Sequence, residues 1–357
     1  MQVGIVGMGI MGSLLALALQ NAGWQVTLFD QTTGKSNCSL TAAGLLTPFS
    51  ELDKADFLIF RLGQETIHSG WPLIINQLSA NIYFKHQGSV MLCHPQDEAE
   101  WQHFNRRIAR YFNQTNTYLH LLTAAQLVKL EPELDKFKQA YYFPDEAQID
   151  SQAIMAALKT YLLTQDVKYV TNTTVVAIKP KLIDTGLTGR HRFDLVVDCR
   201  GLGAKLVFPD LRAVRGELIW LHAPEVNLQR PVRLLHPRYN LYIVPRPDDI
   251  YLIGASEIEA EDYSPISVQT TLELLTAAYY VHAGFAEARI IKTSTHCRPA
   301  LLNHLPRIKY TEGLIAVNGL YRHGFLIAPA LAADILRALK TNLQTIHYPE
   351  IWEINYD

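Results

Sequence analysis

The sequence has little that would indicate a nucleic-acid, metal-binding or disulfide-stabilised protein. Its 357 residues carry a formal net charge of −2, and no lysine and arginine cluster is interleaved with aromatic residues, so we expect no nucleic-acid partner. The four cysteines lack C-x-x-C or framework spacing, which favours a reducing, cytoplasmic setting. The thirteen histidines show no paired-ligand spacing such as H-E-x-x-H, so we expect no metal site.

Long uninterrupted hydrophobic runs are also missing. The apolar segment from Val3 to Leu19 comes nearest, but glycines interrupt it at turn spacing and no basic residue precedes Lys35. We interpret it as part of a cytoplasmic fold, and not as a signal peptide or a membrane span. Internal repeats and low-complexity linkers are absent, and the 48% hydrophobic content can fill the cores of about two domains.

The same apolar segment predicts a strand, a tight turn and a helix. A strand over Val3–Val6 is followed by Gly7, Gly9 and Gly12 in G-x-G-x-x-G spacing, and a helical pattern then continues to Gln20. In such a motif the first glycine forms the turn, the second lets the backbone approach a pyrophosphate, and the third lets the helix lie close to the strand. The free N–H groups of the helix end then bind the phosphates.

A carboxylate stands where a dinucleotide site needs one. The next predicted strand, Gln25–Phe29, ends in Asp30, eighteen positions after Gly12. This is close to the roughly 20-residue spacing expected for a carboxylate that accepts ribose hydroxyls. Such a carboxylate repels a 2′-phosphate, which argues against NADP. The motif predicts a dinucleotide site, with a purely structural turn as the alternative, and it leaves the identity of the dinucleotide open.

Small residues dominate the segment from Cys38 to Pro48, with Gly44 at its centre. This composition suits a backbone pressed against a flat ligand, and it equally suits a turn at which helices pack closely. The pattern alone leaves both interpretations open.

The order of predicted elements indicates an α/β fold with two domains. Helices are predicted near 52–61, 65–78, 98–112, 151–163, 268–282 and 328–339, with a short capped helix opening at Thr123. Strands are predicted at 82–84, 89–92, 168–170, 174–178, 193–197, 214–221, 241–245, 251–255, 289–295 and 314–317. We expect a discontinuous Rossmann-like domain of residues 1–81, 139–212 and 295–357. A second, substrate-binding domain of residues 82–138 and 213–294 would contain an antiparallel or mixed sheet with flanking helices.

Several motifs in order resemble the D-amino-acid oxidase-like (DAO) family of flavoproteins, and within it the glycine oxidases. They cover nearly the whole chain: Gly7-Met-Gly-Ile-Met-Gly12, Thr41-Ala-Ala-Gly-Leu-Leu46, Val214-Arg-Gly-Glu217, Tyr242-Ile-Val-Pro-Arg246 with Gly254-Ala-Ser256, Cys297-Arg-Pro299, and Asn318 to Pro329. The chain departs from the family at Asn303, where an aspartate is usual, and at Asp198-Cys-Arg-Gly201, where small residues are usual.

The resemblance implies non-covalent FAD in an extended pose. It assigns Gly7, Gly9, Ile10, Met11 and Gly12 to the pyrophosphate, Asp30 and Gln31 to the adenosine ribose, Cys38, Ser39, Ala43, Gly44 and Leu45 to the phosphates and flavin, Val175 to the adenine, Gly201 to the second glycine turn, and Leu320, Tyr321, Arg322, His323, Gly324, Phe325 and Leu326 to the isoalloxazine ring.

The resemblance also implies that Arg298 and Tyr242 hold a substrate carboxylate and that Arg322 lines the substrate pocket. A planar guanidinium matches a carboxylate through two parallel hydrogen bonds, and a phenol adds one directed donor. The local sequence alone also allows Arg298 to form a surface ion pair and Tyr242 to be a core residue. Arg322 stands in a glycine-flanked turn after a strand, a position that favours function over packing.

The activity that the resemblance implies is FAD-dependent oxidation of a small amine or amino acid, such as glycine, sarcosine or a D-amino acid. The flavin accepts a hydride, and the protein mainly orients the substrate, so no dedicated acid–base residue is needed. The expected partners are this substrate and oxygen or a quinone as electron acceptor, with a homo-oligomer as an open possibility. The alternatives are a quinone-linked amino-acid dehydrogenase, a non-catalytic flavoprotein, and an NAD-dependent β-hydroxyacid dehydrogenase, whose C-terminal half would be all helical.

Overall fold

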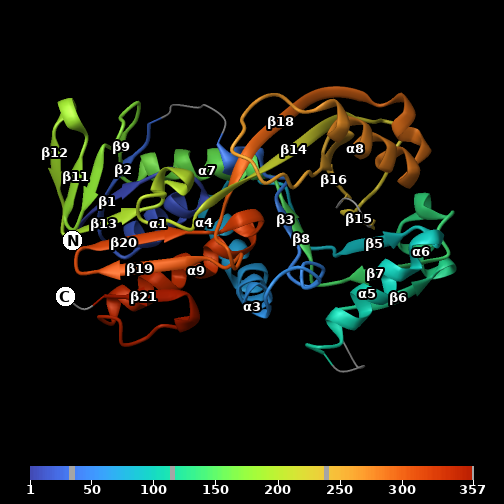
Figure 1. The fold of residues 1–357 in the computed structure, drawn as a ribbon, viewed down its shortest axis with the longest axis horizontal. Helices are drawn as coiled ribbons and strands as arrows, with labels where there is room; N and C mark the ends of the chain where they lie inside the picture. Colours follow the sequence, from blue (N-terminus) through green and yellow to red (C-terminus); the bar gives the residue numbers. More distant parts are fainter. Residues whose placement is uncertain (32–36, 113–116, 237–240, 356–357) are drawn as a thin grey trace.

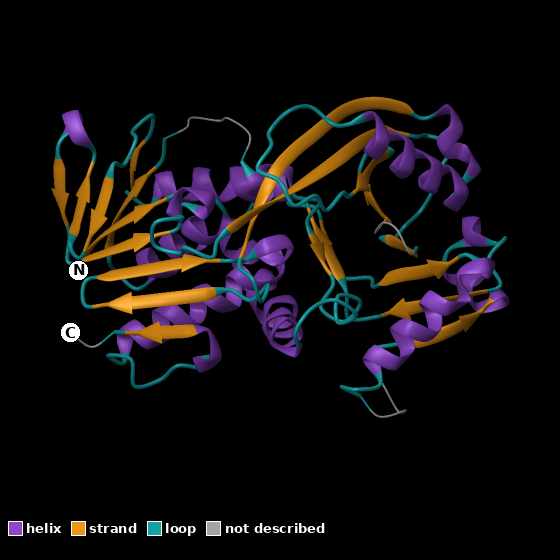
Figure 2. Ribbon diagram, in the orientation of Figure 1, coloured by secondary structure: helices purple, strands orange, loops and turns teal. Residues whose placement is uncertain are grey.

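The computed structural model describes residues 1–31, 37–112, 117–236 and 241–355. The strands in these ranges form four sheets, one of seven strands, one of eight and two of three. The seven-stranded sheet lies on the left of Figure 1 beside the N-terminus, and the eight-stranded sheet occupies the right half. Figure 2 shows that helices gather against the left-hand sheet and at the outer edges of the right-hand one.

The seven-stranded sheet is built around the first strand of the chain. Its order is β21 (Trp352–Ile354), β19 (Arg307–Thr311), β20 (Leu314–Asn318), β13 (Leu195–Asp198), β1 (Gln2–Val6), β2 (Gln25–Phe29) and β9 (Lys168–Val170). β1 pairs in parallel with both β2 and β13, while β19 runs antiparallel to β20. The predicted strand, turn and helix at the N-terminus are therefore confirmed, with α1 covering Ile10–Asn21.

Both faces of this sheet are covered, which explains why β1 is a continuous apolar run. Val3 and Ile5 pack into a large core shared with the helices on one face. Those helices are α1, α3 (Phe57–Glu65), α4 (Trp71–Leu78), α7 (Ser151–Thr164) and α9 (Gly324–Lys340). On the other face lies the antiparallel sheet of β10 (Ala177–Lys179), β11 (Leu182–Asp184) and β12 (Arg190–Arg192), and a Cβ on Gly4 would come within 2.5 Å of the Phe193 ring.

The eight-stranded sheet has its own hydrophobic core, formed with α6 (Ala124–Leu130) and α8 (Val268–Val281). Its order is β18 (Arg289–Ala300), β14 (Arg212–His222), β17 (Ile250–Gly254), β16 (Leu241–Arg246), β15 (Val232–Leu235), β5 (Ser89–Cys93), β7 (Gln139–Phe143) and β6 (His120–Thr123). β5 and β15 pair in parallel, whereas β14, β16 and β17 are antiparallel as predicted. The C-terminal half is therefore not all helical, as an NAD-dependent β-hydroxyacid dehydrogenase would require, and this alternative is wrong.

The remaining elements connect these two parts. β3 (Leu45–Leu46), β8 (Ala147–Ile149) and β4 (Phe84–Lys85) form a small sheet between them in Figure 1, α2 covers Cys38–Thr41, and α5 covers Glu98–Ile108. The division into two domains stays a prediction. However, β7 and the end of β18 belong to the eight-stranded sheet and lie beyond the expected boundaries at 138 and 294. None of the described helices is long and apolar enough to span a membrane.

Several element boundaries differ from those predicted. The helix expected from Leu52 begins at Phe57, because Asp56 accepts the N–H of Leu58 and caps it. The helix expected over 65–78 contains a π-helical turn from Thr66 to Gly70 before α4. The strand expected at 174–178 starts at Ala177, as β10, and pairs with β11. The second glycine turn opens only a 3-10 turn at Gly201–Ala204, and β15 was not predicted.

Candidate functional site

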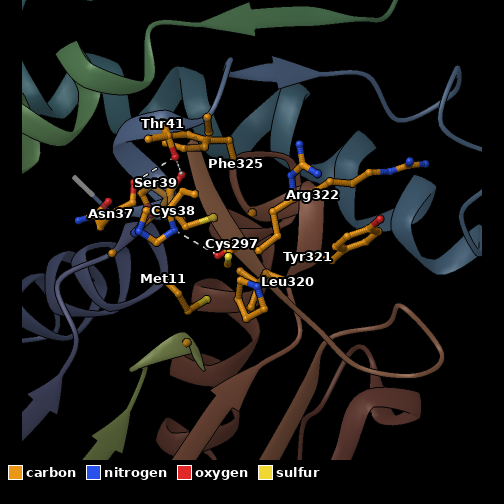
Figure 3. A pocket seen from close by; sticks show the side chains of 18 of the residues that line it. Met11, Asn37, Cys38, Ser39, Thr41, Cys297, Leu320, Tyr321, Arg322 and Phe325 are labelled. Atoms are coloured by element: carbon orange, nitrogen blue, oxygen red, sulfur yellow. Dashed lines mark hydrogen bonds between the residues drawn. The ribbon is translucent and has the colours of Figure 1, made fainter. Parts of the chain in front are cut away.

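A cavity of about 680 Å³ lies where the glycine turn meets the eight-stranded sheet, a volume within the range of ligand pockets. Its lining joins the residues that follow β1, α2, the end of β2, the turn after β13 and the segment before α9. Figure 3 shows Cys38 and Ser39 of α2 on the same lining as Leu320, Tyr321 and Arg322. Every residue assigned above to cofactor or substrate lines this cavity, except Gly12.

The three glycines of the turn have different surroundings. Gly7 has φ +104°, and a Cβ there would lie 2.5 Å from the Cys199 carbonyl oxygen. A Cβ on Gly12 would lie 2.0 Å from the carbonyl oxygen of Gly7, so Gly12 serves the close approach of α1 to the turn. A Cβ on Gly9 would meet only Ser39 Oγ, at 3.2 Å. The space beside Gly9 therefore belongs to the cavity, as a cradle for a phosphate requires.

Two hydrogen bonds hold this turn in place. Asp30 Oδ2 accepts the backbone N–H of Met8 over 2.8 Å, and Ser39 Oγ accepts the N–H of Ile10 over 2.9 Å. Ile10 is the first residue of α1. Gly9 occupies the N-cap position and has no side chain that could accept a hydrogen bond from the first turn of the helix. An anion in the cavity would therefore lie at the positive end of the helix dipole of α1.

The small-residue segment after α2 both lines the cavity and packs tightly. Asn37 caps α2 by accepting the N–H of Leu40 over 2.9 Å. Gly44 has φ +70°, and a Cβ there would lie 1.9 Å from the carbonyl oxygen of Ile149. The carbonyl of Gly44 in turn accepts the N–H of Ile149 over 2.8 Å. The segment therefore combines the two interpretations that the sequence left open: it lines the ligand cavity, and at Gly44 its backbone packs closely against a neighbouring segment.

Arg298 and Tyr242 lie at the end of the cavity formed by the eight-stranded sheet. Arg298 Nη1 donates to the carbonyl oxygen of Ser256 over 3.1 Å, and no described residue forms an ion pair with it. Its guanidinium lies over Gly216, where a Cβ would come 2.3 Å from Nη2. Burial raises the pKa of Tyr242 to about 12, with the charge of Arg298 opposing, so the phenol remains a neutral donor near pH 7.

Arg322 is paired with two carboxylates on the cavity lining. Its Nη2 lies 2.7 Å from Glu51 Oε2 and its Nη1 lies 2.6 Å from Glu257 Oε1. Burial opposes ionisation of Glu51, but Arg322 and Arg233 hold the pKa of this carboxyl at about 2. Arg322 lines the pocket as predicted, but two carboxylates already balance its charge.

Two further titratable side chains of the cavity stay neutral. Burial raises the pKa of the Cys38 thiol to about 11, with Arg298 opposing. Burial also lowers the pKa of the His323 imidazole to about 3. Among the residues that the structure describes, no group of three or more histidine, cysteine or acidic side chains could hold a metal ion.

Among the lining residues that were not assigned a role from the sequence, four lie around Arg298 and Arg322: Glu51, Gly216, Arg233 and Glu257. Gly216 stands in the motif Val214-Arg-Gly-Glu217, so its position could have been found from the sequence, although its contact with Arg298 could not. The other three belong to a loop, to β15 and to the segment after β17. Only the tertiary fold brings them together, and no local pattern marks them.

Comparisons with known proteins agree with this architecture. The model of a family described as FAD dependent oxidoreductase (DAO) matches residues 2–338. A Rhizobium etli protein named as a thiamine biosynthesis oxidoreductase, ThiO, is 34% identical over 96% of this chain and 97% of its own length. Glycine oxidase of Geobacillus kaustophilus is 25% identical over 95% of this chain and 93% of its own length.

Solved structures with the same fold include two oxidases. The crystal structure of the Geobacillus kaustophilus glycine oxidase aligns with a TM-score of 0.85 at 22% identity, over 99% of this chain and 98% of that one. Iminodiacetate oxidase from a Chelativorans species aligns with a TM-score of 0.83 at 21% identity, over 99% of both chains. At these identities the likeness shows the fold alone.

Proposed function

The chain belongs to the family of FAD dependent oxidoreductases, and from this membership we propose that it oxidises a small amino acid at its carbon–nitrogen bond. Glycine, sarcosine and small D-amino acids are the expected substrates, and oxygen or a quinone is the expected electron acceptor. The observation that carries the proposal is Arg298, a cation on the cavity lining that no described carboxylate pairs.

The cavity lining fits FAD. The open space at Gly9 and the N-terminus of α1 suit a pyrophosphate, and Asp30 lies at the end of β2 for the ribose. A second helix end, at Gly324 of α9, lies at the cavity, and a Cβ on Gly324 would meet only Ile10, at 3.6 Å. When bound, FAD would supply the hydride acceptor.

The side chains of this chain would act by positioning the substrate. Arg298 would bind the carboxylate through two parallel hydrogen bonds, and the neutral Tyr242 phenol would donate a third. Glu51 is ionised near pH 7 whereas the Cys38 thiol and the His323 imidazole are neutral, since the pKa of each group lies far from 7. The substrate amine would enter neutral and lose a proton to water.

The reaction balances without a further residue. The α-carbon gives up a hydride and the nitrogen lone pair forms the C=N bond of an imine. Water then adds to the imine and releases ammonia, or the primary amine of an N-substituted substrate, to give a 2-oxo acid. The two electrons leave to oxygen, with release of peroxide, or to a quinone.

The test is the absorption spectrum of the purified protein, followed by anaerobic mixing with a panel of amines. We expect a flavin spectrum that bleaches with glycine, sarcosine or a small D-amino acid, and not with ethylamine. Peroxide release under air would identify oxygen as the acceptor, and its absence with intact bleaching would favour a quinone. A yellow protein that no amine bleaches would contradict the proposal and favour a non-catalytic flavoprotein.

A further inference from the structure

Charged side chains at the substrate end of the cavity form a connected set. Glu51 lies between two arginines, with its Oε1 2.9 Å from Arg233 Nη1 and its Oε2 2.7 Å from Arg322 Nη2. Glu257 closes the set, because its Oε1 lies 2.6 Å from Arg322 Nη1. All of these residues, and Arg298, line the cavity.

This arrangement gives Arg298 and Arg322, two of the arginines that line the cavity, different capacities to bind an anion. Arg298 has a carbonyl partner and no described carboxylate, so it can take one anion. Both terminal nitrogens of Arg322 face a carboxylate, and a further anion could reach these nitrogens only by displacing one carboxylate and leaving it desolvated. Tyr242 lines the same cavity.

We propose that Glu51 and Glu257, by holding Arg322 between them, restrict this enzyme to substrates with a single carboxylate. This inference rests on the proposed amino-acid oxidation. A second carboxylate on the substrate would approach two fixed negative charges, and the cation that could bind it is already paired. Specificity would thus come from a repulsive element as well as from the attraction of Arg298.

Glu257 is the more informative of the two carboxylates to change. Glu51 also holds Arg233 and lies in a buried loop, so its replacement would disturb several contacts. The Glu257 side chain follows β17 and is 30% exposed. Glu257→Gln keeps the shape and removes one negative charge, which makes Arg322 available as a second anion site.

A control lies two residues further along the same segment. Glu259 pairs with Arg212, its side chain is 64% exposed, and it does not line the cavity. Glu259→Gln therefore makes the same charge change near the site without touching Arg322. We expect this control to leave both binding and oxidation unchanged.

The experiment titrates acetate and malonate into the FAD-loaded proteins at constant ionic strength and follows the flavin absorbance. Wild type should bind acetate more tightly than malonate. In Glu257→Gln the ratio of malonate to acetate affinity should rise at least tenfold, and adding Arg322→Gln should remove this gain. In parallel, the ratio of flavin-reduction rates with iminodiacetate and glycine should rise in Glu257→Gln.

The outcomes separate this inference from the proposed function. Wild type that binds malonate as tightly as acetate would overturn the inference, and this measurement depends on no variant folding. An unchanged ratio in Glu257→Gln with normal FAD content would also overturn it. Flavin that no amine reduces would overturn the proposed function, while the carboxylate titration would still decide the inference.

Discussion

The backbone N–H of Ile10 donates to Ser39 Oγ over 2.9 Å, and this bond ties the first turn of α1 to α2. Two segments that are 29 residues apart thereby form one wall of the cavity. Gly9 lies directly beside this bond, since a Cβ on it would reach Ser39 Oγ at 3.2 Å. A substitution at Gly9 should therefore affect the ligand in the cavity, whereas a substitution at Gly12 should affect the packing of α1 against the turn.

Replacing Gly9 should remove the cofactor without unfolding the protein. A Cβ at Gly9 has room apart from Ser39, but it occupies the space where a pyrophosphate must approach. Gly9→Val should yield a folded, colourless protein, and Gly9→Ala should weaken FAD binding about tenfold or more, which is about 1.4 kcal/mol. The flavin absorbance measures the amount of bound FAD, and circular dichroism measures whether the variant is folded.

Gly12→Ala is the matched comparison, because a Cβ there would lie 2.0 Å from the backbone oxygen of Gly7. It should lower the stability of the whole protein and not the FAD affinity alone. A fully flavinated Gly9→Val protein would contradict the assignment of this site.

Ser39→Ala should have a smaller effect on the cofactor. The change removes one hydroxyl from the cavity lining and leaves the N–H of Ile10 free to bind a phosphate oxygen directly. A neutral hydrogen bond contributes about 0.5–1.5 kcal/mol, so we expect FAD affinity to fall by roughly 2- to 12-fold at most. Titration of the apoprotein with FAD measures the change, and a colourless variant would show that Ser39 has a larger structural role.

How much the sequence could predict depended on how local each feature is. The strand, turn and helix from Val3 to Gln20 follow from short-range periodicity and glycine spacing, and the structure confirms them. The capping box of Thr123 and Gln126 is equally local and is also confirmed. β15 is different, because it contains only Val232–Leu235 and lies between β16 on one side and β5, more than a hundred residues away in the sequence, on the other.

The candidate site shows the same limit. Arg298 and Tyr242 were assigned by resemblance, and both line the cavity together with the glycine turn. The pairing of Arg322 with Glu51 and Glu257 could not be predicted, because it joins a turn, a loop and the segment after β17, which no sequence pattern relates.

A buried carboxyl outside the cavity should make stability depend on pH. Glu146 is fully buried and accepts the N–H of Ser50 over 2.7 Å and the hydroxyl of Ser89. Burial raises the pKa of Glu146 to about 7, with the hydrogen bonds from Ser89 and Ser50 opposing. The folded state therefore retains a proton that the unfolded state loses above a pKa of about 4.3.

The stability from this proton is complete below the unfolded pKa and is lost as pH rises towards 7. Glu146→Gln lacks this dependence. From pH 5 to pH 8, the variant should therefore gain stability relative to wild type by on the order of 1–3 kcal/mol. Thermal unfolding of both proteins across this range measures the difference, and parallel curves would show that Glu146 does not titrate in the native state.

Gly216→Ala should displace the substrate-binding arginine without removing it. A Cβ at Gly216 would come 2.3 Å from Arg298 Nη2, and the flexible guanidinium can move aside. A displacement of about 1 Å can cost on the order of 100-fold in rate, so kcat/KM should fall by roughly 10- to 100-fold. FAD content should be unchanged. Normal kinetics would show that the position of Arg298 does not matter for catalysis.

The sharpest test is the removal of Arg298. If it forms a bidentate pair with the substrate carboxylate, Arg298→Ala leaves that anion desolvated and unpaired, at a cost of about 2–5 kcal/mol. This corresponds to a loss of roughly 30- to several-thousand-fold in kcat/KM. Arg298→Lys should recover only part of the loss, because an ammonium is a point charge and not a planar fork.

Steady-state kinetics and anaerobic flavin reduction of both variants measure this loss, and FAD content should stay normal because Arg298 is assigned to substrate. Near-normal reduction of Arg298→Ala by the best amino acid would contradict the assignment. Arg322 would then be the other cation to consider, but Glu51 and Glu257 already hold both of its terminal nitrogens. A carboxylate could move to Arg322 only when one of these glutamates is neutralised, so Arg298→Ala combined with Glu257→Gln should regain part of the lost activity.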